Sequence, residues 1–183
     1  ISAEIDRENA IIADLLTMVK LDKTQAEMNI QSHNINELLE LILKRLRPIA
    51  KKQNIEMVFE SFREVTAEVD EVKLTLALTN FVENAIKYNK ENGWVHVSLD
   101  ANHKFFFVKV IDSGCGIPEE AQEHIFERFY RVDKSHSREI GGTGLGLAIA
   151  KNIVLMHKGI IEISSVVNEG TTITVRIPLN YIA

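Results

Sequence analysis

One predicted helix carries an unusual set of polar side chains. Over residues 72–89, at about 100° per residue, the apolar side chains face one way and four polar ones form a strip on the other side: Asn80, Glu83, Asn84 and Lys87. A solvated helix face is the ordinary interpretation, but Asn is a poor helix former. Amide and carboxylate oxygens suit a hard cation such as Mg²⁺, and a lysine one turn further on suits a phosphate.

Two glycine-rich segments offer a second kind of chemistry. Residues 112–116, Asp-Ser-Gly-Cys-Gly, follow an apolar strand. A carboxylate there can accept a hydrogen bond from an exocyclic amine while bare backbone approaches a flat ring, although a tight turn capped by Asp is equally compatible. Residues 141–147 open a helix, and backbone N–H groups at a helix start bind anions. The spacing and the lysine of a Walker loop are missing, and a polar loop precedes this segment instead of a strand.

The elements that must position these groups follow from periodicity and turn signals. Asn34 with Glu37 resembles a capping box, and residues 95–99 alternate as a half-buried strand does. Residues 105–111 form a dense apolar run, for which we expect a strand buried on both faces. The predicted elements are a helix over 1–23, a linker over 24–31, helices over 34–52, 72–89, 119–126 and 145–157, and strands over 55–60, 64–69, 95–99, 105–111, 161–163 and 173–177. This order predicts an α+β fold, a two-layer sandwich of a mixed sheet covered on one face by helices.

Composition narrows the class of protein. The 183 residues are 45% hydrophobic and 26% charged, which is typical of a soluble globular domain with a small appendage. The net charge of −5 does not indicate nucleic acid as a partner. A single cysteine, Cys115, rules out an internal disulfide and fits a reducing compartment. No apolar run approaches the roughly 18 residues of a spanning helix. The chain begins at Ile1 inside a helical pattern, so we expect a piece of a longer protein.

Four motifs in order carry a resemblance to a known family. Residues 80–88, 112–116, 126–131 and 142–147 closely resemble the asparagine box, first glycine box, phenylalanine box and second glycine box of the sensor histidine kinase catalytic domain. That domain has the Bergerat-type ATP-binding fold shared with gyrase, Hsp90 and MutL. The resemblance implies a catalytic ATP-binding domain over 31–183. Residues 1–30 are similar to the second helix of the family's dimerisation hairpin, followed by a linker.

The resemblance also implies roles for individual residues around ATP and Mg²⁺. Asp112 would accept from the adenine amino group, with Gly114, Gly116 and Ile117 shaping the pocket. Asn84, helped by Asn80, would bind Mg²⁺. The other contacts it implies are Lys87 and Arg131 to phosphates, Tyr88 to base or ribose, Thr172 near adenine, backbone of Gly142, Thr143, Gly144, Leu145, Gly146 and Leu147 to phosphates, and Phe126 and Phe129 as lid residues.

One position bears on the reaction. ATP-hydrolysing members of the superfamily carry a glutamate four residues before the metal-binding asparagine, and here that residue is Asn80, which cannot take a proton near neutral pH. Glu83 lies about 100° around the helix from Asn84, so we do not expect it to replace that base. The resemblance therefore implies transfer of the γ-phosphoryl group to another nucleophile. The expected acceptor is a histidine on a dimerisation domain of a homodimer, for relay to a response regulator.

None of the six histidines has the acceptor's expected sequence setting, so we expect no self-phosphorylation by this chain. The parent is expected to be anchored in the bacterial plasma membrane, with this domain in the cytoplasm. The alternatives are a serine kinase of the anti-sigma type, a nucleotide-binding interaction module without transfer activity, and an ATPase. Asn89 replaces the Ser or Thr that is commoner in the family, which we take as a small change.

Overall fold

The computed structural model describes residues 8–17, 27–128, 130 and 146–182. Residues 8–17 are helical. The elements that follow are β1 (Gln31–Asn34), α2 (Ile35–Lys52), β2 (Glu56–Ser61), β3 (Thr66–Val69), α3 (Glu71–Lys87), β4 (Trp94–Ala101), β5 (Phe105–Asp112), α4 (Glu119–Gln122), α6 (Gly146–Met156), β6 (Ile160–Val166) and β7 (Gly170–Pro178). Among the described residues, none of the helices has the length and hydrophobicity that a membrane span requires.

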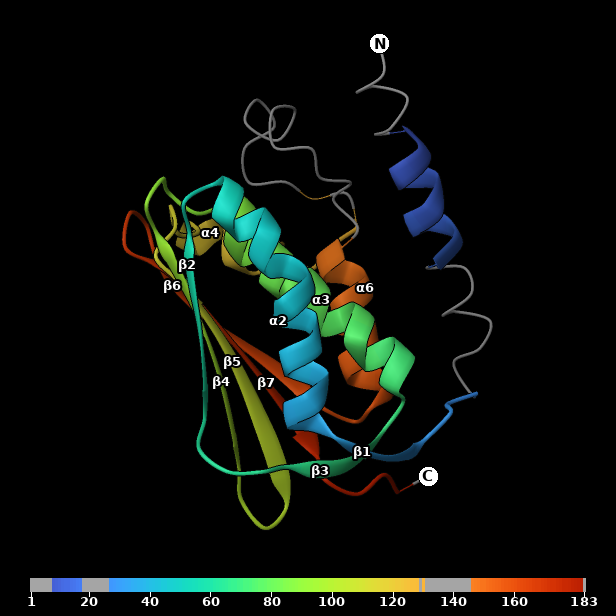
Figure 1. Cartoon of the computed structure of the whole chain (residues 1–183). Helices are drawn as coiled ribbons and strands as arrows, with labels where there is room; N and C mark the ends of the chain where they lie inside the picture. Colours follow the sequence, from blue (N-terminus) through green and yellow to red (C-terminus); the bar gives the residue numbers. More distant parts are fainter. Residues whose placement is uncertain (1–7, 18–26, 129, 131–145, 183) are drawn as a thin grey trace.

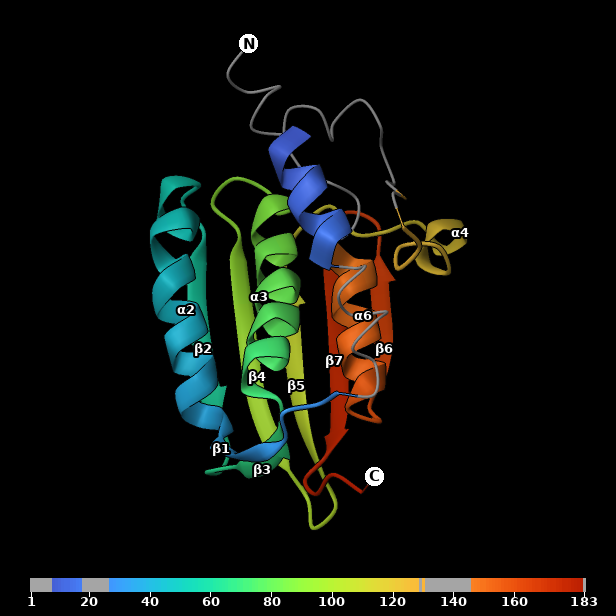
Figure 2. The same ribbon diagram turned by 90° about the vertical axis from the view of Figure 1, so that its right-hand side faces the viewer.

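The main sheet has five strands in the order β2-β4-β5-β7-β6. β2 runs parallel to β4, and the other neighbours are antiparallel. Helices α2, α3 and α6 lie side by side on one face of this sheet (Figures 1 and 2). The predicted α+β architecture, a mixed sheet covered on one face by helices, is therefore confirmed.

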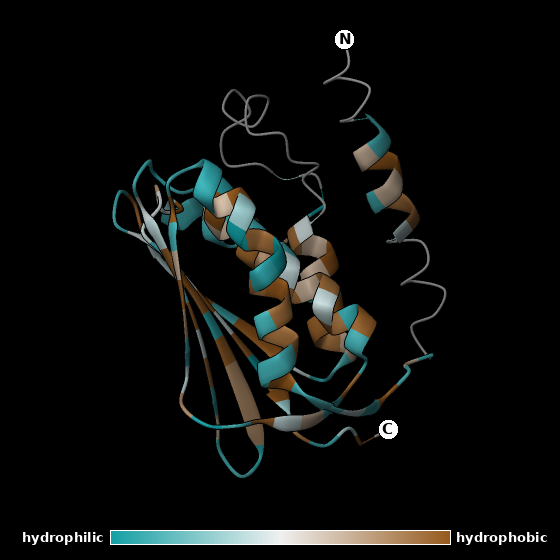
Figure 3. Ribbon diagram, in the orientation of Figure 1, coloured by the Kyte–Doolittle hydropathy of each residue, from teal (hydrophilic) through white to brown (hydrophobic). Residues whose placement is uncertain are grey.

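Local sequence explains where the helices begin. The Asn34 side chain accepts a hydrogen bond from the Glu37 backbone N–H at 3.1 Å, which caps α2 as the capping-box pattern predicted. Asp70 caps α3 in the same way through the Lys73 N–H, also at 3.1 Å. Both helices alternate between hydrophobic and hydrophilic residues along their ribbons (Figure 3), and their hydrophobic residues are mostly buried. The fully buried side chains at their centre include Leu39, Leu78, Phe81, Leu99 and Phe106.

The expectation that residues 105–111 are buried on both faces is wrong. In β5, Phe106, Val108 and Val110 point toward the helices and are buried, whereas Lys109 is exposed and Phe107 is half-buried. The reason is that the helices cover only one face of the sheet. On the open face, an aromatic side chain of this run contacts a charged residue: the Arg176 guanidinium lies 4.4 Å from the centre of the Phe105 ring.

A small second sheet was missed by the periodicity argument. β1 pairs antiparallel with β3, with Gln31 opposite Val69. The predicted linker therefore ends in a strand, and its preceding residues also contact the domain, since the Asn29 N–H donates to the Asp70 carboxylate at 3.0 Å. The four residues of β1 have no apolar alternation that a pattern could detect. The short helix α4 covers four residues and not the eight predicted.

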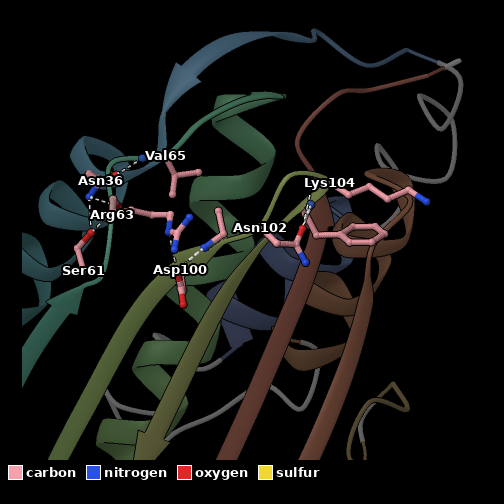
Figure 4. A network of polar contacts seen from close by, with 9 residues as sticks. Asn36, Ser61, Arg63, Val65, Asp100, Asn102 and Lys104 are labelled. Carbon is pink, nitrogen blue, oxygen red and sulfur yellow. Dashed lines mark hydrogen bonds and ion pairs between the residues drawn. The ribbon is translucent and has the colours of Figure 1, made fainter.

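The loops at one end of the sheet, where β4 ends and β5 begins, are joined by polar contacts (Figure 4). The Asn36 amide donates to Ser61 Oγ at 2.6 Å and accepts from the Val65 N–H at 2.8 Å. Arg63 pairs with Asp100 at 3.0 Å. In the β4–β5 turn, Asn102 Oδ1 accepts from the N–H groups of Lys104 and Phe105, each at 2.8 Å. The glycine segment 112–116 and the last turn of α3 lie at the opposite end.

Candidate functional site

The polar strip of α3 is present as predicted and is half-buried. Lys87 lies in the last turn, 4.0 Å from Glu83 in an i,i+4 ion pair. The Asn84 side chain makes no hydrogen bond to the described part of the chain, although it is only partly exposed. A half-buried carboxamide without a protein partner leaves its oxygen available to a ligand.

Asn80 has a contact that the sequence did not predict. Its amide Nδ2 donates to the backbone carbonyl of Gly146 at 3.0 Å, which joins α3 to the first residue of α6. A Cβ added at Gly146 would lie 3.7 Å from the nearest atom, an Asn80 carbon, which is ordinary contact. Steric crowding in this conformation therefore does not require glycine at position 146.

Asp112 ends β5 and is the titratable group at this site with the largest resolved shift. Burial raises its pKa from the ordinary 3.8 to about 6, while hydrogen bonds from the Gly114 and Thr171 backbone N–H groups oppose that rise. The Gly114 bond is 2.8 Å long. At neutral pH Asp112 is therefore an ionised acceptor in a partly dehydrated position.

The first glycine segment packs directly on the end of α3. A Cβ at Gly114 would lie 2.4 Å from the carbonyl oxygen of Tyr88, so only glycine fits there. The Cys115 N–H donates to the same oxygen at 3.3 Å. Tyr88 itself is 38% exposed at the C-cap of α3. The carboxylate of β5 and the polar strip of α3 consequently belong to the same end of the molecule.

The next residues are bound to the β6–β7 hairpin. The Ile117 N–H donates to Ser165 Oγ at 2.7 Å, and the Asn168 N–H donates to the Cys115 carbonyl at 2.8 Å. Gln122, in α4, donates to the carbonyls of both Ile117 (2.9 Å) and Ser165 (3.1 Å). Gly116 has φ +74° and no room for a Cβ, which would lie 2.2 Å from the Val166 oxygen. Sequence reasoning missed Ser165 and Gln122, because neither belongs to a motif.

The structure does not bring Thr172 to the Asp112 side of the sheet. Thr172 is opposite Ile111 and Ser164, whereas Thr171 is opposite Asp112. Side chains alternate between the faces of a strand, so Thr171 shares the helix-covered face with Asp112, and Thr172 points to the open face. Thr171 is buried and its hydroxyl bonds to Ser165 Oγ at 2.8 Å. Of the two threonines, Thr171 is the one that lies beside the carboxylate.

Several predicted residues lie outside the described ranges: Phe129, Arg131, Gly142, Thr143, Gly144 and Leu145. Phe126 is half-buried, packs against the core and lies 5.5 Å below the Lys151 ammonium. Leu147 also packs against the core from the first turn of α6. The described part of the site thus combines the partly buried Asp112 carboxylate with the glycine backbone that follows it. The α3 strip adds two carboxamides and a lysine, and α6 begins beside it.

Comparison with known proteins shows the family. Residues 69–181 match the family described as histidine kinase-, DNA gyrase B- and HSP90-like ATPases. The chain belongs to this family. It is 39% identical over 178 residues to the sensor histidine kinase WalK of Bacillus subtilis (strain 168), and the aligned residues cover 96% of this chain and 29% of that protein. It is 34% identical over 174 residues to the sensor histidine kinase RppB of Synechocystis sp., which covers 94% and 38% respectively.

Solved structures of the histidine kinase family have the same fold. The catalytic domain of the histidine kinase ThkA superposes with a TM-score of 0.74 at 32% identity, covering 84% of this chain and 97% of that one. ThkA in complex with the response regulator protein TrrA gives a TM-score of 0.78 at 27% identity, covering 97% and 49%. The chain spans about a third of the length of the curated relatives named above. It is therefore similar to the catalytic domains of longer sensor kinases.

Proposed function

We propose that this chain is the ATP-binding catalytic domain of a sensor histidine kinase. It transfers the ATP γ-phosphoryl group to a histidine on the dimerisation domain of the same protein, and a response regulator then takes that group. The observation that carries this proposal is the direct packing of Gly114 on Tyr88, which brings the Asp112 carboxylate and the Asn84–Lys87 strip to one end of the fold.

Each described group has a chemical part in binding ATP. Asp112, ionised above about pH 6, accepts a hydrogen bond from the adenine amino group. Gly114 and Gly116 allow the ring to approach the backbone, with Ile117 beside it. Lys87 attracts the phosphates as a point charge, and Tyr88 lies by the base or ribose. Arg131 and the backbone of residues 142–147 complete the phosphate contacts in this proposal.

The residues of α3 fit a Mg²⁺ ion. Asn84 has no hydrogen-bond partner in the described part of the chain, and the Asn80 amide nitrogen is used by Gly146, which leaves the Asn80 oxygen as a ligand. Mg²⁺ prefers hard oxygen ligands and usually takes only a few of them from the protein, because it keeps most of its waters. Two carboxamide oxygens meet both conditions. When bound, the ion would neutralise charge on the phosphate oxygens.

The α3 contacts favour transfer over hydrolysis. The position of the superfamily's general base is Asn80, whose amide donates to the Gly146 carbonyl and cannot take a proton from water. Glu83 is paired with Lys87 one turn along the same helix. The protein's contribution to transfer is then mostly positioning and charge stabilisation. We further propose a homodimeric parent anchored in the plasma membrane, with this domain in the cytoplasm.

Phosphotransfer to a separate acceptor tests this proposal. The purified chain is incubated with γ-labelled Mg·ATP and a histidine-containing dimerisation hairpin from WalK, with the hairpin's acceptor His→Ala variant as the control. Label is expected on the hairpin histidine, as acid-labile phosphate, and not on this chain. Label that appears as free phosphate at the same rate with and without the hairpin would contradict transfer and indicate an ATPase. Acid-stable label on a serine would indicate the anti-sigma type of kinase.

A further inference from the structure

A polar cluster lies next to Asp112 at the end of β5. It consists of Asn89, Ser113 and the backbone of Trp94. The Asn89 amide donates to the Trp94 carbonyl at 2.9 Å, and its oxygen accepts from Ser113 Oγ at 3.0 Å. The Trp94 N–H donates in turn to Ser113 Oγ at 2.8 Å, and the Ser113 N–H donates to the Trp94 carbonyl at 3.2 Å.

The surroundings of the cluster are closely fitted. The Ser113 residue is only 4% exposed. A Cβ at Gly93 would lie 2.2 Å from Asn89 Oδ1 and 2.7 Å from Ser113 Oγ, so glycine at 93 is needed for the cluster to close. Asn89 Oδ1 also accepts from the Lys90 N–H at 2.9 Å, which fixes the direction of the side chain. The amide nitrogen and the amide oxygen of Asn89 are thus both hydrogen-bonded to the protein.

The cluster joins three chain segments that come from different elements. Asn89 follows the last residue of α3, Lys87, by two positions; Trp94 begins β4; and Ser113 follows Asp112 at the end of β5. Between Asn89 and Ser113 the chain runs through the whole β4–β5 hairpin. The side-chain bonds therefore provide a second direct link between the helix end and the strand end, beside the Cys115 N–H bond to the Tyr88 carbonyl.

We propose that Asn89 and Ser113 are positioning residues that fix Asp112 relative to the Asn84–Lys87 strip. The inference rests on the proposed function, in which one ATP molecule contacts both sets of groups. A ligand that spans two sets gains full affinity only when their separation matches its own length, since any mismatch must be corrected on binding. The cluster sets that separation together with the packing of Gly114 on Tyr88. The Asn89 side chain therefore helps to determine the geometry of the site. Its replacement of the family's commoner Ser or Thr has a larger consequence than the sequence alone indicated.

A positioning role and a merely stabilising role predict different ligand dependence. Asp112 keeps its own bonds from the Gly114 and Thr171 N–H groups when the cluster is removed. In the proposed site adenosine contacts Asp112 and Tyr88 but neither Asn84 nor Lys87, so its affinity depends less on the separation. ATP contacts all of these groups, so its affinity depends more strongly on the separation. Loss of the cluster consequently weakens ATP more than adenosine.

The experiment measures the dissociation constants of Mg·ATP and of adenosine for the folded chain and its variants. Asn89→Ala removes the bonds to Trp94 and Ser113. It is expected to weaken the binding of Mg·ATP about five- to thirtyfold, which is the effect of one or two net hydrogen bonds. The binding of adenosine is expected to weaken less than about twofold. Asn89→Ser, which keeps a short hydroxyl, is expected to lie between the wild type and Asn89→Ala. The matched control is Asn102→Ala. It removes two side-chain bonds to backbone N–H groups at the other end of the same hairpin and is expected to change neither affinity.

A double-mutant cycle gives the second readout. Because Asn89 and Ser113 share one hydrogen bond, the ATP affinity losses of Asn89→Ala and Ser113→Ala are expected to be less than multiplicative in the double variant. Equal losses for ATP and adenosine, or a loss of the same size in Asn102→Ala, would overturn the positioning role and indicate general loosening of the fold. Unchanged ATP affinity in Asn89→Ala would overturn it as well. Failure of the wild-type chain to bind Mg·ATP is a separate outcome, which contradicts the proposed function itself.

Discussion

The Asp112 carboxylate is predicted to lower the stability of the nucleotide-free domain. Its pKa in the folded chain is raised to about 6 from the ordinary 3.8, because burial disfavours the ionised form. A carboxyl group with a raised folded-state pKa destabilises the fold when it is ionised in both states, which for Asp112 is above about pH 6. The cost decreases as the pH falls from 6 to below 4. We therefore expect Asp112→Asn to stabilise the nucleotide-free domain at neutral pH while it removes ATP binding.

The magnitude follows from the size of the shift. A rise of about two pKa units corresponds to roughly 3 kcal/mol at about 1.4 kcal/mol per unit. Asp112 is only partly buried, so solvent screens part of this energy, and the replacing amide brings an N–H group that needs its own partner. A gain of about 1–2 kcal/mol in the free energy of unfolding is the expected result at pH 7.5.

Urea unfolding of the two proteins without nucleotide, at pH 7.5 and at pH 4, checks this prediction. The difference is expected to shrink toward zero at pH 4, where wild-type Asp112 is protonated. The control is Glu162→Gln, which replaces an exposed carboxylate on β6. Its free energy of unfolding is expected to stay close to that of the wild type at both pH values. An Asp112→Asn variant that is less stable than the wild type at pH 7.5, or a gain that is independent of pH, would refute the burial argument.

Three further predictions concern single residues. Gly114→Ala is expected to abolish ATP binding by calorimetry, because its Cβ would lie 2.4 Å from the Tyr88 oxygen, whereas a folded Gly114→Ala variant with wild-type affinity would contradict that packing. Lys87→Ala is expected to weaken Mg·ATP about tenfold and leave adenosine unchanged, as one charge-assisted contact predicts, and an equal loss for both ligands would place Lys87 elsewhere. His157→Ala is expected to cost about 2–4 kcal/mol of stability in urea unfolding, because it removes buried side-chain volume and leaves the buried Asp70 N–H, now 3.0 Å from Nε2, without its acceptor. The Ile153 carbonyl loses its 2.9 Å bond to Nδ1 but keeps the backbone N–H of residue 157. A cost below about 0.5 kcal/mol would show that neither bond matters.

Local sequence signals predicted most of the fold. The Asn34 cap, the alternation in β4 and the β6–β7 hairpin are short-range patterns, and each is where the sequence indicated: Ile163 is opposite Ile173 across the hairpin. The failures have a common cause. The strand β1 and the open face of β5 depend on what packs against them, and that information lies in distant parts of the chain.

The same limit applies to the candidate site. Motifs indicated Asp112, Gly114, Asn84 and Lys87 as candidates, because a nucleotide site needs those residue types at fixed spacing. Motifs cannot state which of two adjacent threonines faces the carboxylate, since that depends on strand register. Nor can they show hydrogen bonds between separate elements, such as Asn80 to Gly146 or the cluster around Asn89.

Calorimetric titration with Mg·ATP tests most sharply whether the β5 end and the α3 strip form one ATP site. We expect one ATP per chain, no binding by Asp112→Asn, and binding by Asn84→Ala that no longer depends on Mg²⁺. Failure of the folded wild-type chain to bind ATP, or Mg²⁺-dependent binding that both variants retain, would show that the two sets of groups do not form one site.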